Sequence, residues 1–305
     1  LFKLHAMSKQ PNRRQVLKNI IAGTAAVGNA AMLSSFANSD NSTEALKLKG
    51  NINHSVCQWT YGFLPLEELC VTVKKLGLGA IDLIAPKDWP TLQKHGIHCS
   101  MCYTAGDISL TEGWNKPSNH SKLIQQFTEA IPLVQQAGYK NLICFSGNRN
   151  GMDDETGLKN CTEGLKKIMG LAEKHGVIIQ IEIFNSKINH KDYMADKSAW
   201  AVELCKRIGS ENFKILYDIY HMQVNEGDVI RTIRDNHQYF GHYHTAGVPG
   251  RNEINETQEL YYPAIMNAIV ATGYKGYVAQ EFIPTAKEPK DKIAALKKAI
   301  QICDV

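Results

Sequence analysis

The sequence predicts an α/β protein built on a single (β/α)8 barrel, and two observations lead to this fold class. Short apolar runs alternate with stretches of helical periodicity from about residue 51 onward, in strict order. Glycine stands at the helix stop in five joints between a helix and the next strand: "KKLGLGAI", "QKHGIHC", "QQAGYKNL", "EKHGVII" and "ATGYKGY". Because regular β-α alternation implies parallel strands, eight units favour a closed TIM barrel. An open doubly wound sheet is the competitor, but no glycine-rich phosphate fingerprint follows the first strand.

The expected elements follow from this alternation. Strands are predicted at 53–59, 80–84, 97–104, 141–146, 177–184, 213–219, 239–245 and 276–282. Helices are predicted between them, at 66–76, 88–95, 120–137, 156–175, 197–208, 226–236, 259–272 and 288–302. The barrel domain therefore occupies residues 51–305, after a leader at 1–37 and a linker at 38–50.

The leader "NRRQVLKNIIAGTAAVGNAAMLSSFA" resembles a twin-arginine export signal. Arg13 and Arg14 precede a mildly apolar stretch rich in Ala and Gly, and the small residues Ser35 and Ala37 suit cleavage. The resemblance predicts a periplasmic protein that is exported in folded form, or a cytoplasmic one if the signal is not used. An amphipathic or disordered N-terminus is the alternative. The apolar run is too short and too rich in small residues for a stable membrane span, so no membrane insertion of the mature chain is expected.

The net charge excludes one class of partner. The whole chain carries +4, but the first 37 residues hold five basic residues and no acidic one, which leaves −1 for the remainder. No basic surface remains to attract nucleic acid, so the expected partner is a small molecule, with a homo-oligomer left open.

All eight cysteines follow the leader. Twin-arginine export carries proteins that have already folded in the reducing cytoplasm, so buried free thiols are expected rather than disulfides. The pair Cys99 and Cys102 in "CSMC" invites a zinc or redox interpretation, but no second pair at matching spacing exists. The apolar run around it predicts a strand, and packing thiols are the simpler interpretation.

The last four predicted strands each end in a residue that can bind a metal ion: Glu182 in "QIEIFN", Asp218 in "LYDIYH", His244 in "GHYHT" and Glu281 in "AQEF". A carboxylate in an apolar strand is costly unless it is paired or bound to a cation. A barrel gathers the C-terminal ends of its strands on one face. Three carboxylates and one imidazole suit Mn²⁺ or Mg²⁺, with Co²⁺ and Zn²⁺ as alternatives.

The set Glu182, Asp218-x-x-His221, His244 and Glu281 resembles the xylose isomerase-like barrels, which include hydroxypyruvate isomerase, ketose 3-epimerases and inosose dehydratase. The segment "AGVPGRNE" is similar to the "VPGR" segment of hydroxypyruvate isomerases. The resemblance implies that Glu182, Asp218, His244 and Glu281 hold a metal ion, that Glu182 and Glu281 also form the acid/base pair, and that His221 contacts the substrate. The histidine at 244 departs from hydroxypyruvate isomerases, which typically carry glutamine there, and matches ketose epimerases.

Four further residues are candidates for substrate contact. His242 lies one level deeper than His244 on the same strand face, where it orients His244 or the substrate, or packs as a core histidine. Arg251, on the turn beyond, suits a bidentate clamp on a substrate carboxylate or a solvated loop position. Asn185 follows the fifth strand and Trp114 lies in the long loop after the third, where both can line the mouth or serve as a cap and a packing residue.

Together these features predict a divalent-metal-dependent isomerase that moves a proton through an enediolate, with hydroxypyruvate and tartronate semialdehyde as the expected pair. A ketose 3-epimerase and a keto-sugar lyase or dehydratase would use the same metal site. A sugar-binding barrel without catalysis is the non-enzymatic alternative, although binding alone does not need a pair of glutamates.

Overall fold

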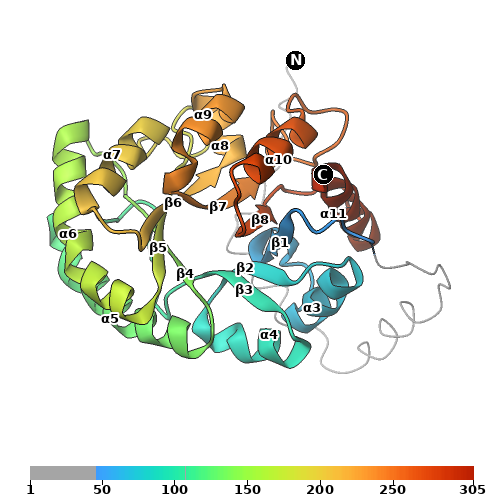
Figure 1. Cartoon of the computed structure of the whole chain (residues 1–305), viewed down its shortest axis with the longest axis horizontal. Helices are drawn as coiled ribbons and strands as arrows, with labels where there is room; N and C mark the ends of the chain where they lie inside the picture. Colours follow the sequence, from blue (N-terminus) through green and yellow to red (C-terminus); the bar gives the residue numbers. More distant parts are fainter. Residues whose placement is uncertain (1–45, 107) are drawn as a thin grey trace, which may run out of the picture. The chain divides into compact units, whose positions relative to one another are not determined.

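Eight parallel strands form a closed barrel in which each strand pairs with its neighbours in sequence and β8 pairs with β1 (Figure 1). The computed structural model describes residues 46–106 and 108–305. The strands are β1 (Asn53–Cys57), β2 (Ala80–Ile84), β3 (His98–Cys102), β4 (Asn141–Cys144), β5 (Ile178–Glu182), β6 (Phe213–Asp218), β7 (Phe240–Thr245) and β8 (Tyr277–Gln280). The predicted fold class is therefore confirmed.

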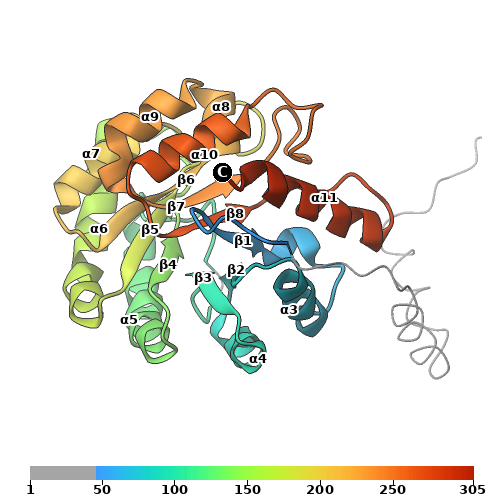
Figure 2. The ribbon, with the colours of Figure 1, turned by 45° about the vertical axis from the view of Figure 1, so that its right-hand side comes forward.

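Helices surround the barrel on the outside (Figure 2). They are α3 (Leu66–Lys75), α4 (Trp89–His95), α5 (His120–Gln136), α6 (Asp154–His175), α7 (Ser198–Ile208), α8 (Ile219–Asn225), α9 (Val229–Asn236), α10 (Tyr262–Ala271) and α11 (Pro289–Cys303). Short 3-10 turns add η1 (Gln58–Tyr61), η2 (Pro86–Asp88), η3 (Pro117–Asn119) and η4 (His237–Tyr239). Each helix buries one stripe against the strands, which is the layer order that strict β-α alternation requires.

The glycine joints behave as the sequence predicts. All five glycines at the predicted helix stops have positive φ: Gly77, Gly96, Gly138, Gly176 and Gly273. A left-handed residue after the last helical turn satisfies the free carbonyl groups there and reverses the chain toward the next strand. The joints therefore set the compact spacing of successive units.

The predicted helix at 226–236 differs from the structure. Two helices stand there, because α8 begins directly after β6 and ends before Gly227, and α9 starts after Asp228. Both Gly227 and Asp228 have positive φ, which breaks the helix. The side chain of Asp218 accepts a hydrogen bond from the backbone N–H of His221 and so caps α8. This early start draws His221 toward the barrel mouth.

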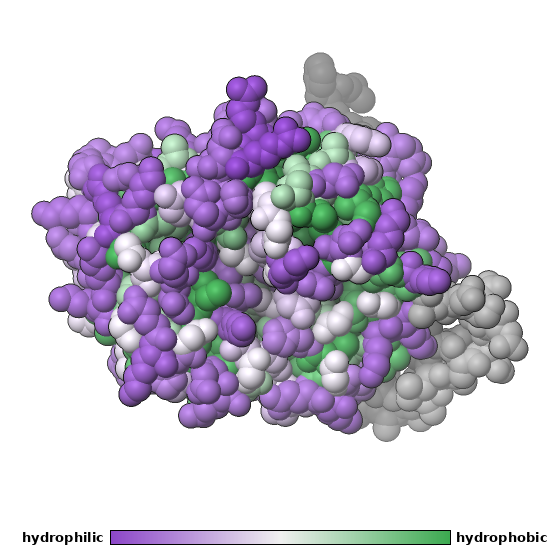
Figure 3. All heavy atoms as spheres, in the orientation of Figure 1, coloured by the Kyte–Doolittle hydropathy of each residue, from purple (hydrophilic) through white to green (hydrophobic). Residues whose placement is uncertain are grey.

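The core consists of the inward strand residues and the buried helix faces. All eight cysteines are buried and free, which confirms the expectation of thiols rather than disulfides. Cys99 and Cys102 lie in β3 with their sulfur atoms 3.4 Å apart. Hydrophilic side chains cover most of the face seen in Figure 3. Among the described helices, none is long and apolar enough to span a membrane.

The predicted export signal at 1–37 and most of the linker lie outside the described residues. The end of the predicted linker, residues 46–50, is described and packs with the barrel. Leu46 and Leu48 contact the hydrophobic core, and the Lys49 backbone N–H donates a 2.9 Å hydrogen bond to Asp304.

Candidate active site

The four predicted metal ligands meet at the C-terminal mouth of the barrel. Glu182 and Asp218 end β5 and β6, His244 is the penultimate residue of β7, and Glu281 directly follows β8. One ligand atom from each residue lies within 4.8 Å of the others, and all four side chains are buried. Asp218 and His244 are direct register partners across β6 and β7. The parallel ladders thus bring together residues that are up to a hundred positions apart in the chain.

The imidazole of His244 lies at the centre of this cluster. Its Nδ1 is 3.0 Å from Glu182 Oε1 and 3.0 Å from Glu281 Oε2. The contact with Glu281 is a hydrogen bond, whereas Glu182 Oε1 makes none with any described residue. Burial lowers the pKa of His244, but the surrounding anionic groups outweigh burial and raise this pKa well above its usual range. Protonated His244 thus partly offsets the carboxylate charge.

The chemistry of this donor set fits a divalent cation. Three carboxylates and one imidazole converge in a buried space, and an oxygen of Glu182 is left without a hydrogen bond. Buried carboxylates so close together require compensating positive charge. Oxygen-rich donors with one nitrogen suit Mn²⁺, Mg²⁺ or Co²⁺, and Zn²⁺ accepts them as well.

The ionisation of the three carboxyl groups differs with their surroundings. Burial raises the pKa of Glu182, and it raises the pKa of Asp218 to about 8 with help from the nearby charge of Glu281. Burial acts in the same direction on Glu281, but the charges of His244 and Arg251 reverse it and hold the pKa of Glu281 well below its usual range. Of the three carboxyl groups, Glu281 is therefore the one that ionises most readily.

Arg251 and Trp59 hold Glu281 from two sides. Arg251 Nη2 donates to Glu281 Oε2 at 2.6 Å and lies 3.9 Å from Asp218 Oδ2. Trp59 Nε1 donates to Glu281 Oε1 at 2.8 Å, and the guanidinium carbon of Arg251 lies 5.1 Å from the Trp59 ring centroid. Trp59 lies in η1, directly after β1, and 44% of its surface is exposed at the mouth.

The loop after β7 is shaped to present Arg251. Arg251 itself has φ of 59°, a left-handed conformation that costs a non-glycine residue on the order of 1 kcal/mol. A backbone hydrogen bond from Gly247 to Asn252 closes the turn at 2.8 Å, and Ile283 N–H donates to the Arg251 carbonyl oxygen at 2.7 Å. These bonds join the β7 and β8 loops and hold the guanidinium over the carboxylates.

His221 presents a hydrogen-bond donor beside the cluster. Its Nδ1 accepts from the Asn185 backbone N–H at 3.1 Å, which places the ring proton on Nε2. That Nε2 is buried, lies 3.8 Å from Asp218 Oδ2 and makes no hydrogen bond with a described residue. Burial and the charge of Arg251 lower the pKa of His221 well below its usual value. His221 is thus a neutral donor available to a ligand.

Asn185 supports His221 instead of facing the cavity. Its Oδ1 accepts from the backbone N–H groups of Ile188 and Asn189, both at 3.0 Å. Its Nδ2 donates to Asn189 Oδ1 at 2.8 Å and contacts His221 Nδ1 at 2.6 Å. With both polar atoms engaged, Asn185 organises the loop after β5 and has no free group for substrate.

Trp114 and His242 also lie away from the cluster. Trp114 is buried between α5 and α6, where the centroid of its ring lies 5.4 Å from that of Phe127. Of its two predicted roles, packing is therefore the one in the structure, and contact at the mouth is wrong. The large indole finds more apolar contact there than at the solvated mouth. His242 lies one level below His244, fully buried, with Nε2 on Asp82 Oδ2. It therefore faces Asp82 and not the space among the metal ligands.

Asp82, at the middle of β2, is a residue that the sequence analysis misses. It is fully buried, and its Oδ2 lies 3.2 Å from His244 Nε2 and within hydrogen-bond distance of His242 Nε2. Leu83, the next residue, has φ of 65° at a register irregularity between β2 and β3. Such a bulge re-aims the adjacent side chain. A signal is present in the sequence, because an acid inside the apolar run "AIDLI" demands a partner just as Glu182 does.

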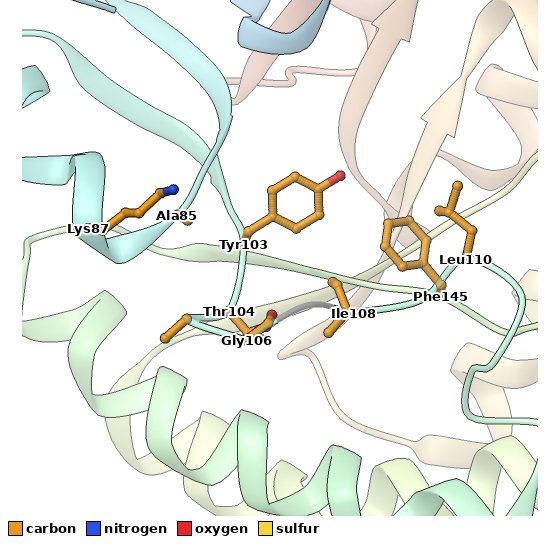
Figure 4. A pocket seen from close by; sticks show the side chains of 9 residues that line it. Ala85, Lys87, Tyr103, Thr104, Gly106, Ile108, Leu110 and Phe145 are labelled. Carbon is orange, nitrogen blue, oxygen red and sulfur yellow. The ribbon is translucent and has the colours of Figure 1, made fainter. Parts of the chain in front are cut away.

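A cavity of about 320 Å³ opens at the ends of β2, β3 and β4 (Figure 4). Its lining includes Lys87, Tyr103, Leu110 and Phe145. Burial is the main cause that raises the pKa of Tyr103, and the charges of Glu182 and Glu281 act in the same direction. The cavity volume lies at the lower end of the range for small-molecule sites.

The fold and site define a class: a closed parallel barrel that gathers buried carboxylate and imidazole groups at the C-terminal ends of its strands. Within this class, residues 90–299 match the family model of the xylose isomerase-like TIM barrel. The chain therefore belongs to the xylose isomerase-like TIM barrel family.

Two curated relatives that match part of this chain are named as isomerases. A 2-oxo-tetronate isomerase of Cupriavidus necator is 32% identical over 124 residues, which are 41% of this chain and 47% of the relative. The hydroxypyruvate isomerase of Escherichia coli K12 is 28% identical over 172 residues, 55% of this chain and 65% of the relative. The matched region thus spans from about half to two thirds of the length of these relatives.

Solved structures share the fold. An AP endonuclease, family 2, from Brucella melitensis aligns with a TM-score of 0.69 and 22% identity over 78% of this chain and 96% of that one. A D-psicose 3-epimerase from Clostridium cellulolyticum H10 aligns with a TM-score of 0.67 and 17% identity over 83% of this chain and 100% of that one. At this identity the likeness concerns the barrel alone.

Proposed function

We propose that this protein is a divalent-metal-dependent isomerase that interconverts a small keto compound and its aldo isomer by proton transfer through an enediolate. Hydroxypyruvate and tartronate semialdehyde are the pair to test first. The observation that supports this proposal is the buried cluster of Glu182, Asp218, His244 and Glu281, in which two glutamates approach one imidazole nitrogen. The names of the curated relatives, which are isomerases of small keto acids, favour the same chemistry.

The protein groups divide the work by their contacts. A bound divalent cation supplies Lewis acidity that makes the proton beside a carbonyl group easier to remove. Glu182 Oε1, which has no hydrogen bond with a described residue, is placed to take that proton. Glu281 is fixed by Trp59 and Arg251 and is placed to return a proton or relay one. Two carboxyl groups in such different surroundings suit different roles.

Two donors are free to orient the substrate. The Nε2–H of His221 can donate to a substrate oxygen beside Asp218. Arg251 Nη2 donates to Glu281. The buried Nε of Arg251 makes no hydrogen bond with a described residue and can donate to a carboxylate or hydroxyl oxygen of the substrate.

A ketose 3-epimerase is the second candidate, and the histidine at position 244 favours it. Epimerisation needs the same metal, the same proton removal and a proton delivered to the opposite face of the carbon. A keto-sugar lyase or dehydratase would share the first half of this reaction. A binding barrel would need no acid/base pair.

The test is hydrogen exchange at carbon. The chain from about residue 38, loaded with Mg²⁺, is incubated in heavy water with hydroxypyruvate, 2-oxo-tetronate and a panel of ketoses, and NMR follows the protons beside each carbonyl group. Exchange that needs both Mg²⁺ and Glu281, with Glu281→Gln as the comparison, supports the proposal, and the product identifies the substrate. Ligand binding without exchange for every compound would contradict isomerase and epimerase alike and favour a binding barrel.

For the cellular site we propose the periplasm, on the basis of the Arg13-Arg14 leader. Export of a reporter fused after residue 50 tests this, with Arg13→Lys/Arg14→Lys as the comparison. A reporter that stays in the cytoplasm with both leaders contradicts it.

A further inference from the structure

The carboxylate of Asp82 is the meeting point of four polar side chains beneath the metal-binding cluster. Its Oδ1 accepts from the hydroxyl groups of Ser55, at 2.7 Å, and Ser100. Its Oδ2 faces Nε2 of His242 and, at 3.2 Å, Nε2 of His244. All five side chains are buried. An ionised carboxylate in this position only accepts hydrogen bonds, so each atom that faces it must carry a proton.

This arrangement determines which nitrogen of His244 is free. Without a cation, His244 is protonated and its Nδ1–H donates to Glu281; when a cation displaces that proton, the neutral imidazole keeps one N–H group, and Asp82 holds it on Nε2. The lone pair then resides on Nδ1, the atom 3.0 Å from both Glu182 and Glu281. Nδ1 is thus the nitrogen that a cation held by the glutamates would meet. If the proton sat on Nδ1 instead, His244 would offer the cation a hydrogen in place of a lone pair.

The contacts of Asp82 also explain why this carboxylate stays in position. The hydroxyl groups of Ser55 and Ser100 contact Oδ1, and the two imidazoles contact Oδ2. Rotation of the carboxyl group would break all of these contacts, so the carboxylate stays in one orientation. His242 competes for the same oxygen as His244 and fills the space below it, with the two rings at 82° and 5.3 Å between centroids. The group is therefore a rigid, buried support beneath the cluster.

We propose that Asp82 is a positioning residue that selects the metal-binding nitrogen of His244, supported by Ser55, Ser100 and His242. The inference rests on the proposed metal site and goes beyond it, because Asp82 touches neither the substrate nor the space among the four ligands. Loss of such an outer partner of a metal-binding histidine commonly weakens metal affinity ten- to hundredfold.

The test measures metal affinity and tautomer, neither of which depends on turnover. Titration calorimetry with Mn²⁺ compares wild type, Asp82→Ala, Asp82→Asn and a control, Asp304→Ala. Asp304 offers the matched control because it also faces a buried histidine, His54, at 3.7 Å, far from the ligand cluster. We expect a ten- to hundredfold rise in the Mn²⁺ dissociation constant for Asp82→Ala and no change for Asp304→Ala. Asp82→Asn should lie between, since its amide oxygen can still accept from His244 Nε2.

Nitrogen-15 NMR of histidine-labelled, Mg²⁺-loaded protein reports the tautomer directly. We expect the Nε2–H form of His244 in wild type and a mixed or Nδ1–H form in Asp82→Ala. A variant that melts at lower temperature yet binds Mn²⁺ with unchanged affinity would overturn the proposal and leave Asp82 a packing residue. If wild type binds no metal, the proposed function fails alone. Nitrogen-15 NMR of metal-free protein at a pH high enough to deprotonate His244 then decides the present inference, and an Nδ1–H form of the neutral ring refutes it.

Discussion

Replacement of Arg251 by methionine should have opposite effects on folding and on metal binding. The guanidinium is nearly buried, and its Nη2 lies 2.6 Å from Glu281 Oε2 and 3.9 Å from Asp218 Oδ2. Removal of one partner from a buried ion pair typically costs 3–5 kcal/mol, about 4 kcal/mol as a working value. For a barrel of this size each kcal/mol corresponds to about 2–4 °C in melting temperature, so the metal-free Arg251→Met variant should melt about 8–16 °C below wild type.

Metal binding should change in the other direction. Arg251 and a bound cation would neutralise the same two carboxylates, so each disfavours the other. Two unit charges about 4 Å apart interact by about 4 kcal/mol at an effective dielectric constant of 20, and relaxation and water absorb much of this. We expect the Mn²⁺ dissociation constant of Arg251→Met to fall about tenfold, which adds about 1.4 kcal/mol to the stabilisation by saturating metal.

The assay is a pair of melting curves for each protein, with chelator and with saturating Mn²⁺. The rise in melting temperature on addition of metal should be larger for Arg251→Met than for wild type by about 3–6 °C. Arg251→Lys serves as the control, because it keeps the charge but loses the planar fork, and its metal-induced rise should match wild type. A smaller rise for Arg251→Met than for wild type would refute the view that arginine and metal share the carboxylate charge.

Three further predictions concern groups around the mouth. Trp59→Phe removes the indole N–H from Glu281 and should lower kcat/KM about tenfold with little change in melting temperature, so an unchanged rate would show that this hydrogen bond does not position the carboxylate. Burial raises the pKa of Asp218 to about 8, so this carboxyl group is protonated below that pH. A cation that binds there must displace the proton. Affinity for Mg²⁺ should therefore rise with pH and level off above about 8. Calorimetry in buffers of different ionisation enthalpy should show the release of this proton. An affinity that stays constant between pH 6 and 9 would contradict the prediction. Tyr262→Phe removes a hydroxyl group that accepts from the Ala246 N–H at 3.0 Å and donates to the Ala246 carbonyl oxygen at 2.7 Å, so unfolding free energy should fall by about 1–3 kcal/mol in denaturant titration, and a loss below 0.5 kcal/mol would indicate that water replaces both bonds.

The barrel could be predicted from the sequence because its signals are local and repeated. Alternating apolar runs and glycine joints report on segments of about ten residues, and each joint such as Gly176 carries its own backbone requirement. The helix break at Gly227 and Asp228 was hidden because periodicity continues on both sides of it.

The sequence predicts those site residues whose chemical type alone demands a partner. It does not predict those whose role depends on the direction in which the side chain points. A carboxylate at a strand end must find a cation or a donor, which identifies Glu182 and Glu281. The same rule applied to the second strand would have found Asp82. For Trp59 and Trp114, the sequence does not show the side to which each indole turns, and the structure places Trp59 against Glu281 and Trp114 against Phe127. Those directions depend on contacts between segments that are distant in the chain.

The seam between β1 and β8 has a consequence for the order of events in folding. These strands are the first and last of the barrel, paired from Asn53 with Tyr277 to Val56 with Gln280. Closure of the seam joins segments at the greatest sequence separation in the barrel, the kind of contact that forms late because its loop entropy is largest. Trp59 and Glu281 lie on opposite sides of this seam and meet only across it. A nascent or truncated chain that ends before β8 therefore contains Trp59 but lacks Glu281, the fourth residue of the cluster, and with it the hydrogen bond between them. The proposed cation site would thus be complete only in molecules in which β1 and β8 have already paired.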